Sequence, residues 1–291
     1  MKIKLIYFIY RVLALFDKII IKFTKNSFLT VLKEFIEEDS YTAINILAKK
    51  ITFFTPTKIT KWRVDTFFSK EPETLEWIDS FKNTNKIIFW DIGSNIGLYS
   101  IYAALKHENI EVVSFEPSTS NLRSLSRNIS INNLYKKIKI SQFPLTEKKN
   151  QYLLMKESSF VEGGALHTFG ENFDHEGKPF KGKNNYIIYG TSIDYLIDSK
   201  VLLVPNYIKI DVDSVEHLIL RGGKKYLSSP EIKSISVELN ENFKEQHDEV
   251  FKILQESGFE FINKKRSAKI DVSNKFFGTY NFIFVKKNAF S

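Results

Sequence analysis

From Ile87 onward the chain alternates short apolar runs with segments of helical spacing. The runs are rich in β-branched and aromatic residues and apolar at consecutive positions, which is typical of strands covered by helices on both faces. Seven runs are strand candidates: KIIFWDIG, EVVSFEP, KIKISQFPL, NYIKIDVD, SISVELN, FEFIN and YNFIFVKK. Strands that alternate with helices in this way predict a doubly wound α/β domain with a mostly parallel sheet.

The first quarter of the chain follows a different pattern. Residues 27–50 have helical spacing, and EPETLEWIDSFKNTN places Pro72 near the first position of another helix. We therefore expect a helical cap over residues 1–84 and a separate α/β domain over residues 85–291. Between the third and fourth strands of that domain, residues 158–185 are glycine-rich and polar, too long a stretch for a simple connection.

The opening MKIKLIYFIYRVLALFDKIIIKFTKN combines basic and apolar residues. Its longest uncharged run, Leu5 to Tyr10, has six residues, whereas a bilayer span needs about 20. No small-residue cleavage site follows, so the segment neither spans a membrane nor resembles a cleaved signal.

On a helix, the basic residues of this segment form one narrow stripe on a mostly apolar cylinder. The stripe contains Lys4, Arg11, Lys18, Lys22 and Lys25. One interpretation lays residues 1–25 in the interface of an anionic membrane, at its inner face. The other packs the apolar surface on the protein's own core and leaves the stripe in water.

Charge and composition exclude several classes of protein. The net charge is +8, but residues 1–70 hold 13 basic and 6 acidic residues, which leaves 29 and 28 in the rest. Residues 71–291 are thus balanced in charge, and we expect no nucleic-acid partner. The absence of cysteine excludes disulfides and thiolate metal sites, and the five histidines lack metal-ligand spacing. We expect a cytoplasmic protein.

A glycine turn follows the first strand of the α/β domain. Asp91-Ile-Gly93-Ser-Asn95-Ile-Gly97 joins this strand to a helix, the place where α/β proteins bind nucleotides. Asn95 stands where the dinucleotide fingerprint needs a second glycine, which argues against NAD or FAD. Glu116, 23 positions after Gly93 at the end of the next strand, can accept hydrogen bonds from both ribose hydroxyls. The pattern predicts an adenosine-type nucleoside without a diphosphate.

Several segments in the same order resemble the FkbM-type family of S-adenosylmethionine-dependent methyltransferases. They are FWDIGSNIGLYS, VVSFEPSTSNLRSLSRNISINN, FPLT, TSIDYLI, YIKIDVDSVEHLILRGG, ISVELN and TYNFIF. The resemblance covers residues 86–287. It implies a Rossmann-like class I methyltransferase sheet of seven strands, the last antiparallel, with helices on both faces.

The resemblance also implies a cofactor site for S-adenosylmethionine. The turn under its methionine part would be formed by Asp91, Gly93, Asn95 and Gly97. The ribose would be held by Glu116 and the following Pro117. The adenine would lie close to Pro144, within residues 142–146. The family usually has glycine after the acidic residue of its DV(D/E)G motif, whereas this chain has Ser214. Ser214 can cap the following helix, but the changed turn alters the expected geometry of Asp213.

Charged residues cluster at the end of the fourth strand. Because side chains alternate along a strand, Lys209, Asp211 and Asp213 are expected on the same face. Glu216 follows them in the sequence, and Glu238 lies on the next strand. One reading makes Asp211 or Asp213 a base, a substrate clamp or a ligand for a divalent metal, together with Glu238. The other reading is an ion pair of Lys209 with a carboxylate, with Asp213 or Ser214 capping a helix.

His167, in the long glycine-rich segment, is a candidate base or substrate contact because histidine titrates near neutrality. We predict catalytic roles for Asp211, Asp213, Glu238 and His167, and a metal site is not assigned. The resemblance implies O-methylation of a sugar hydroxyl in a surface glycan or its lipid-linked precursor. An N-methyltransferase acting on a small molecule, an NAD-linked enzyme and a non-catalytic, membrane-associated nucleoside-binding module are the alternatives.

Overall fold

The computed structural model describes residues 2–82, 85–266 and 277–287. The chain divides into two compact units, residues 1–42 and residues 43–291. Each unit is described by itself below.

The first unit contains two helices, α1 (Lys2–Thr24) and α2 (Phe28–Glu38). The turn between them depends on Asp17, which interrupts the apolar sequence of α1. Its carboxylate is buried and accepts hydrogen bonds from the Ser27 hydroxyl at 2.8 Å and from the Leu29 N–H at 3.2 Å. Asp17 thus joins the end of one helix to the start of the next.

Most apolar side chains of α1 are exposed, including Ile6, Phe8 and Leu15. Lys25 has φ +61° and follows the end of the helix, so the predicted cationic stripe consists of the other four basic residues. Within the described part of the chain, no helix has the length and apolarity that crossing a bilayer requires.

Residues 41–54 form a β-hairpin and not the continuation of the helix that their spacing suggested. Its strands are β1 (Tyr41–Ile46) and β2 (Lys49–Phe54), with Leu47 and Ala48 at positive φ in the turn. Isoleucine and threonine are frequent in both strands, and such β-branched residues favour strands over helices. The expectation of a helix over 27–50 was therefore correct only as far as Glu38.

The main sheet of the second unit contains every strand that the sequence predicted. Its strands are β3 (Ile87–Ile92), β4 (Ile110–Phe115), β5 (Ile138–Ser141), β9 (Tyr207–Ile210), β10 (Ser234–Asn240), β11 (Phe259–Lys265) and β12 (Thr279–Lys286). Their order in the sheet is β11-β12-β10-β9-β3-β4-β5. Only β12 runs antiparallel to its neighbours β10 and β11, as the class I methyltransferase sheet requires.

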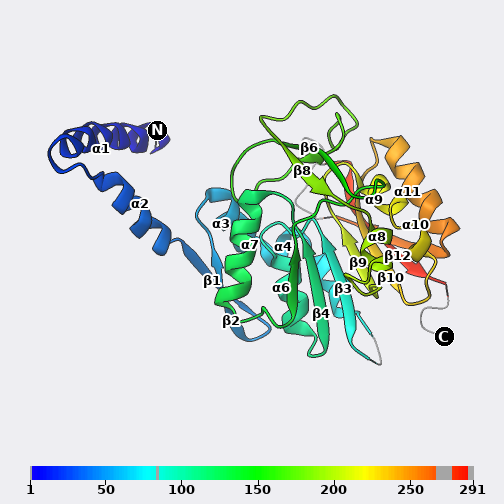
Figure 1. The fold of residues 1–291 in the computed structure, drawn as a ribbon. Helices are drawn as coiled ribbons and strands as arrows, with labels where there is room; N and C mark the ends of the chain where they lie inside the picture. The colour runs from blue at the N-terminus through cyan, green and yellow to red at the C-terminus, as the bar shows by residue number, and fades with distance from the viewer. Residues whose placement is uncertain (1, 83–84, 267–276, 288–291) are drawn as a thin grey trace. The chain divides into compact units, whose positions relative to one another are not determined.

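Helices cover both faces of this sheet (Figure 1). One face carries α8 (Ile193–Asp198), α9 (Glu216–Arg221), α10 (Lys224–Leu227) and α11 (Lys244–Glu256); the other carries α6 (Leu98–Lys106) and α7 (Thr119–Ile131). Alternate residues of β3 divide between two apolar cores: Ile88 and Trp90 face the first group of helices, and Ile87 and Phe89 the second. Burial of both faces explains why the strands are apolar throughout.

The segment before β3 belongs to this same unit, so the structure places the division at residue 42 and not near residue 84. It contains α3 (Lys58–Asp65), α4 (Phe67–Lys70) and α5 (Pro72–Asp79), the last with its proline at the predicted position. Phe81, just after α5, stacks on Tyr207 of β9 with ring centroids 3.8 Å apart. Aromatic packing on the sheet therefore makes this segment part of the core.

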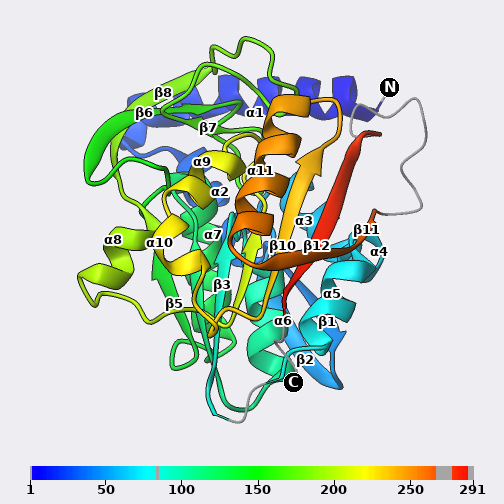
Figure 2. The ribbon, with the colours of Figure 1, turned by 90° about the vertical axis from the view of Figure 1, so that its right-hand side faces the viewer.

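The long segment between β5 and β9 builds a second, antiparallel sheet. Its strands are β6 (Gln151–Glu157), β7 (Thr168–Phe169) and β8 (Asn184–Gly190), in the order β7-β6-β8. Figure 2 shows them gathered at one end of the main sheet. A bridge between Leu145 and Thr191 ties this small sheet to the chain that follows β5.

Candidate active site

Most residues that the sequence singled out line one cleft at the carboxyl ends of β3, β4 and β9. This edge includes the place between β3 and β9 where the strand order reverses, which is where open α/β sheets bind ligands. The wall of the cleft includes Gly93, Asn95, Glu116, Pro117, Pro144, His167, Asp211 and Asp213. Asp91, Gly97 and Glu238 lie outside this wall.

The turn after β3 requires glycine. Gly93 has φ +86°, and a Cβ on it would lie 1.8 Å from the carbonyl oxygen of Asp211. Gly97 begins α6 with φ +88°, and its Cβ would lie 2.6 Å from a methyl carbon of Leu125. Asn95, between them, also has a positive φ, +52°. The glycines thus let the turn pack directly on the chain just after β9 and on α7, and Gly93 and Asn95 line the cleft.

Asp91 lies beneath that turn and does not face the cleft, contrary to our expectation for a strand-end residue. It is fully buried and accepts a hydrogen bond of 2.5 Å from the Ser100 hydroxyl, which in turn accepts one from Ser114. Burial raises the pKa of Asp91, although the nearby Lys209 opposes the shift. Asp91 therefore connects β3 to α6, and its effect on a ligand passes through the turn.

Glu116 stands at the end of β4 with both carboxylate oxygens bound to backbone. One oxygen accepts the Asn95 N–H and the other accepts the Ser118 N–H, each at 2.8 Å. The side chain is buried, and burial raises its pKa to about 8 in spite of these two bonds. Each oxygen retains a lone pair for a further donor, so the residue can still receive two ribose hydroxyls.

Pro144 also lines the cleft, together with its apolar neighbours Phe143 and Leu145. Its carbonyl accepts the Thr191 N–H at 3.1 Å, and the Thr191 carbonyl accepts the Thr146 N–H at 2.9 Å. The second sheet thereby holds this wall in place. An apolar slot of this kind suits a flat heterocycle.

A loop from the second sheet crosses the cleft, and we call residues 158–167 the strap. The carbonyl of Gly164 accepts hydrogen bonds from the side-chain amides of Asn95 at 2.7 Å and Asn121 at 3.1 Å. The Leu166 N–H donates to Asp213 at 2.7 Å. The strap is thus attached to the glycine turn, to α7 and to the end of β9.

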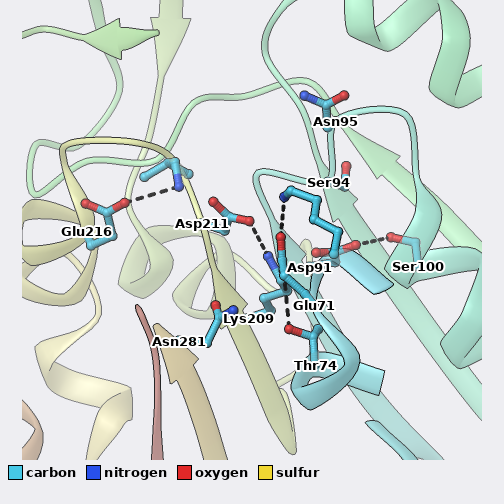
Figure 3. A network of polar contacts seen from close by, with 12 residues as sticks. Glu71, Thr74, Asp91, Ser94, Asn95, Ser100, Lys209, Asp211, Glu216 and Asn281 are labelled. Atoms are coloured by element: carbon cyan, nitrogen blue, oxygen red, sulfur yellow. Dashed lines mark hydrogen bonds and ion pairs between the residues drawn. The ribbon is translucent and has the colours of Figure 1, made fainter. Parts of the chain in front are cut away.

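Acidic and basic side chains meet beside the cleft at the end of β9 (Figure 3). Lys209 is buried and its ammonium lies 2.6 Å from a carboxylate oxygen of Asp211. Glu71, from the start of α5, forms an ion pair with Lys70. Carboxylate oxygens of Glu71, Asp211 and Glu238 lie within 4.8 Å of one another. We call these five residues the charge cluster.

The charge cluster fixes the protonation of its members. Burial alone would raise the pKa of Asp211, but Lys209 and Lys70 hold it at about 2, and Glu238 donates a hydrogen bond to it. Burial and the charges of Asp211 and Glu71 raise the pKa of Glu238 well above its usual range. Asp211 is therefore ionised at neutral pH, whereas the raised pKa of Glu238 favours its protonated form. The predicted ion pair of Lys209 is present in the structure.

Asp213 faces the cleft with a pKa raised by burial and by the charge of Asp211. Its own φ is +71°, so the strained position of this turn falls on the aspartate and not on Ser214. The expected helix cap is absent: the Ser214 hydroxyl has no hydrogen-bond partner among the described residues, and Val215 precedes α9 without a side-chain cap. The alternative that made Asp213 or Ser214 a cap was wrong.

Glu216 is buried beneath the same turn and supports it. Its carboxylate accepts the Val212 N–H at 3.2 Å and the Gln246 side-chain amide at 2.7 Å. Burial raises the pKa of Glu216 to about 8. Glu216 therefore shapes the loop that carries Asp211 and Asp213.

His167 contributes to the cleft from the strap. Its Nδ1 accepts the Ser158 N–H at 3.2 Å, and burial lowers its pKa. Its other ring nitrogen is buried and has no partner among the described residues.

Three residues of the site had no signal in the sequence. Glu71 and Lys70 come from the segment that we took for a separate cap, and neither has a motif around it. Asn121 lies in a helix whose sequence resembles the family's, but nothing distinguished it from its polar neighbours. Only tertiary packing brings Asn121 to the cleft and Lys70 and Glu71 to the charge cluster beside it.

A family model confirms the resemblance. The methyltransferase FkbM domain matches residues 91–261, more than half of the chain, and this range contains the turn, Glu116, the strap and the end of β9. The chain belongs to the FkbM methyltransferase family. This family is the one that the sequence motifs predicted. No protein of curated function matches the sequence.

Solved structures similar to this FkbM-family chain are distant in sequence. A methyltransferase FkbM from Methylobacillus flagellatus KT is 14% identical over 71% of this chain and 45% of its own, with a TM-score of 0.48. A putative rRNA methylase from Clostridium thermocellum is 10% identical over 75% of this chain and 96% of its own, with a TM-score of 0.44. A putative tRNA methyltransferase from Streptococcus pneumoniae, in complex with S-adenosyl-L-methionine, is 14% identical over 74% and 72%, with a TM-score of 0.40.

Proposed function

We propose that this FkbM-family enzyme transfers a methyl group to a hydroxyl oxygen of a sugar, in a surface glycan or its lipid-linked precursor. The observation that supports an oxygen acceptor is Asp213, a cleft carboxylate whose pKa burial and Asp211 raise above the usual range. A hydroxyl must lose its proton as the new carbon–oxygen bond forms, and a raised carboxylate pKa favours accepting that proton. The sugar itself is inferred from the family resemblance.

The residues of the cleft fit the cofactor. Glu116 would receive the ribose hydroxyls, Pro144 and its apolar neighbours would hold the adenine, and the turn at Gly93 and Asn95 would lie under the methionine part. A Cβ at Gly93 would overlap the backbone of β9, so the cradle depends on this glycine. S-adenosylmethionine supplies an electrophilic methyl group when it is bound.

Asp211 and Asp213 have different tasks in this proposal. Asp211, held ionised by Lys209, orients the acceptor by accepting a hydrogen bond, and its low pKa makes it a poor base. Asp213 takes the proton. Glu238 and Glu71 act through Asp211, because both lie against it in the charge cluster.

We propose that the reaction needs no divalent metal. Three carboxylates alone would resemble a cation site. Here two of them pair with the ammonium groups of Lys70 and Lys209. Burial and acidic neighbours raise the pKa of Glu238, which favours its protonated form. With Glu238 protonated the cluster carries no net charge without a metal, so turnover should be unchanged by EDTA.

Transfer of a ¹³C-labelled methyl group tests the acceptor. The enzyme would be incubated with methyl-labelled S-adenosylmethionine and a panel of free sugars, sugar nucleotides, lipid-linked sugars and small amines, and the products would be analysed by NMR. A labelled methyl ether on a sugar supports the proposal. A labelled N-methyl product with no methyl ether would instead support the N-methyltransferase alternative.

We further propose that α1 holds the enzyme at the inner face of a membrane through residues 1–25. Lys4, Arg11, Lys18 and Lys22 supply positive charge, and each basic residue near an anionic surface contributes about 1 kcal/mol. The exposed apolar side chains of α1 supply the part that enters the interface. No nucleic-acid partner is proposed, because residues 71–291 hold 29 basic against 28 acidic residues and are balanced in charge.

Co-sedimentation with vesicles tests the membrane proposal. Binding to phosphatidylglycerol vesicles should exceed binding to neutral vesicles, fall as salt rises and be lost without residues 1–25. A variant with glutamine at the four basic positions keeps the apolar surface and controls for charge. Equal binding of this variant and the wild type would contradict the electrostatic part.

A further inference from the structure

A hydrogen bond between the first and last residues of the strap, Ser158 and His167, holds the ring of His167. The Ser158 N–H donates to Nδ1 at 3.2 Å, and the Ser158 hydroxyl donates to the Ala165 carbonyl at 2.7 Å, which closes the loop. The neighbouring Leu166 N–H is bound to Asp213. Turning the ring over would break the hydrogen bond from the Ser158 N–H to Nδ1.

This arrangement determines which ring nitrogen carries the proton. A neutral imidazole has one N–H and one lone pair, and Nδ1 uses its lone pair to accept from Ser158. The proton of the neutral ring must then be on Nε2. Burial lowers the pKa of His167 and favours this neutral form, while the charged groups that act on it, Glu157 and Arg63, have opposite effects.

The Nε2 atom is buried and has no partner among the described residues, although His167 forms part of the cleft wall. Buried donors are nearly always paired in folded proteins. An unpaired donor on the wall of a ligand cleft is most simply completed by an atom of the ligand.

We propose that His167 donates a hydrogen bond through its Nε2–H to a lone-pair oxygen or nitrogen of the ligand in the cleft, and does not act as a base. A base at this position would need its lone pair on Nε2 and hence a proton on Nδ1, directed at the Ser158 N–H. The inference rests on the proposed function for the presence of a ligand, but it does not depend on the identity of the acceptor.

Nitrogen NMR of histidine-labelled protein tests the tautomer without any activity. Five histidines are present, and the spectrum of the His167→Gln variant assigns the signal of His167. We expect Nε2 to be protonated and Nδ1 to be bare between pH 6 and 8. A proton on Nδ1, or a doubly protonated ring in this range, would overturn the proposal.

Two variants then test the donor itself. His167→Gln can place an amide N–H near the position of Nε2, whereas His167→Ala cannot. Affinity for S-adenosylhomocysteine reports a bond to the cofactor, and the KM of a working acceptor reports a bond to the acceptor. We expect His167→Ala to weaken either the affinity for S-adenosylhomocysteine or the KM of the acceptor about tenfold. The same constant in His167→Gln should stay within about threefold of wild type.

The outcomes are distinct. Unchanged values of both constants in His167→Ala would refute the bond to a ligand. A loss of kcat in both variants, with removal of the acid limb of the pH profile, would restore the role of His167 as a base. Glu157 is the alternative partner of Nε2, because its Oε2 is also buried without a partner among the described residues. If Glu157→Gln reproduced the effect of His167→Ala, Nε2 would be bound to Glu157 and the proposal would fail.

Discussion

Acidification from pH 8 to pH 6 should weaken binding of the nucleoside part of the cofactor, because Glu116 must be ionised to receive two ribose hydroxyls. In the free protein burial raises its pKa to about 8. Two further donors favour the charged form and lower the pKa of the complex toward the usual range of a glutamate. Binding below pH 8 must therefore release a proton from Glu116.

The size of the effect follows from linkage. With a pKa of about 8 in the free protein and a value well below 6 in the complex, affinity at pH 6 should be about 50-fold weaker than at pH 8, or about 2.3 kcal/mol. The slope should approach tenfold per pH unit near pH 6 and vanish above pH 9. A group whose pKa did not change on binding would give no slope.

Calorimetry with 5′-methylthioadenosine measures this directly, since that ligand lacks the amino-acid groups of the cofactor. Titrations at pH 6, 7, 8 and 9 in buffers of different ionisation enthalpy give both the affinity and the number of protons released. Glu116→Gln serves as the control and should bind weakly with no pH dependence. An affinity that varies less than threefold between pH 6 and 8, or a slope that persists in the variant, would refute this role of Glu116.

Four other substitutions give distinct signatures. Gly93→Ala should abolish calorimetric binding of S-adenosylhomocysteine, since its Cβ would overlap the Asp211 carbonyl; retained affinity would contradict the cradle. Asp213→Asn should lower kcat at least 100-fold and leave the cofactor affinity within threefold of wild type. Asp211→Asn should mainly destabilise the fold, by about 3–5 kcal/mol, because Lys209 would be buried without its charged partner. Equal melting temperatures of the two variants would contradict this difference between a catalytic and a structural effect. The raised pKa of Glu216 means that folded stability falls as pH rises from 4.5 through 8. Glu216→Gln should therefore reduce the loss of melting temperature between pH 6 and pH 9. The same loss in the variant as in the wild type would contradict this role of Glu216.

The strands of the main sheet were predictable because burial on both faces leaves a continuous apolar run in the sequence. The hairpin at residues 41–54 was not, since Ile44, Leu47 and Ile51 fit a helical spacing and only the β-branched residues of the segment favoured strands. The second sheet was missed for a different reason. β6 and β8 flank the polar, glycine-rich segment and β7 lies within it. The apolar run in each of the two longer strands is only about four residues long, which is too short to distinguish it from a loop.

The site was predictable where residues are close in sequence to a strand end. Gly93, Glu116 and Asp213 lie in the cleft for this reason. Alternation did not reveal that Asp91 points under the turn, because it divides a strand into two faces without saying which one meets the ligand. Glu71 could not be found at all, since its place beside Asp211 depends on the packing of α4 and α5.

The central claim is that the cleft at the carboxyl ends of β3, β4 and β9 binds S-adenosylmethionine and not a dinucleotide. Calorimetric titration of the full chain with S-adenosylhomocysteine and, separately, with NAD tests it most directly. We predict binding of one S-adenosylhomocysteine per chain, lost in Gly93→Ala, and no heat of binding with NAD. Binding of NAD in preference to S-adenosylhomocysteine would contradict the account.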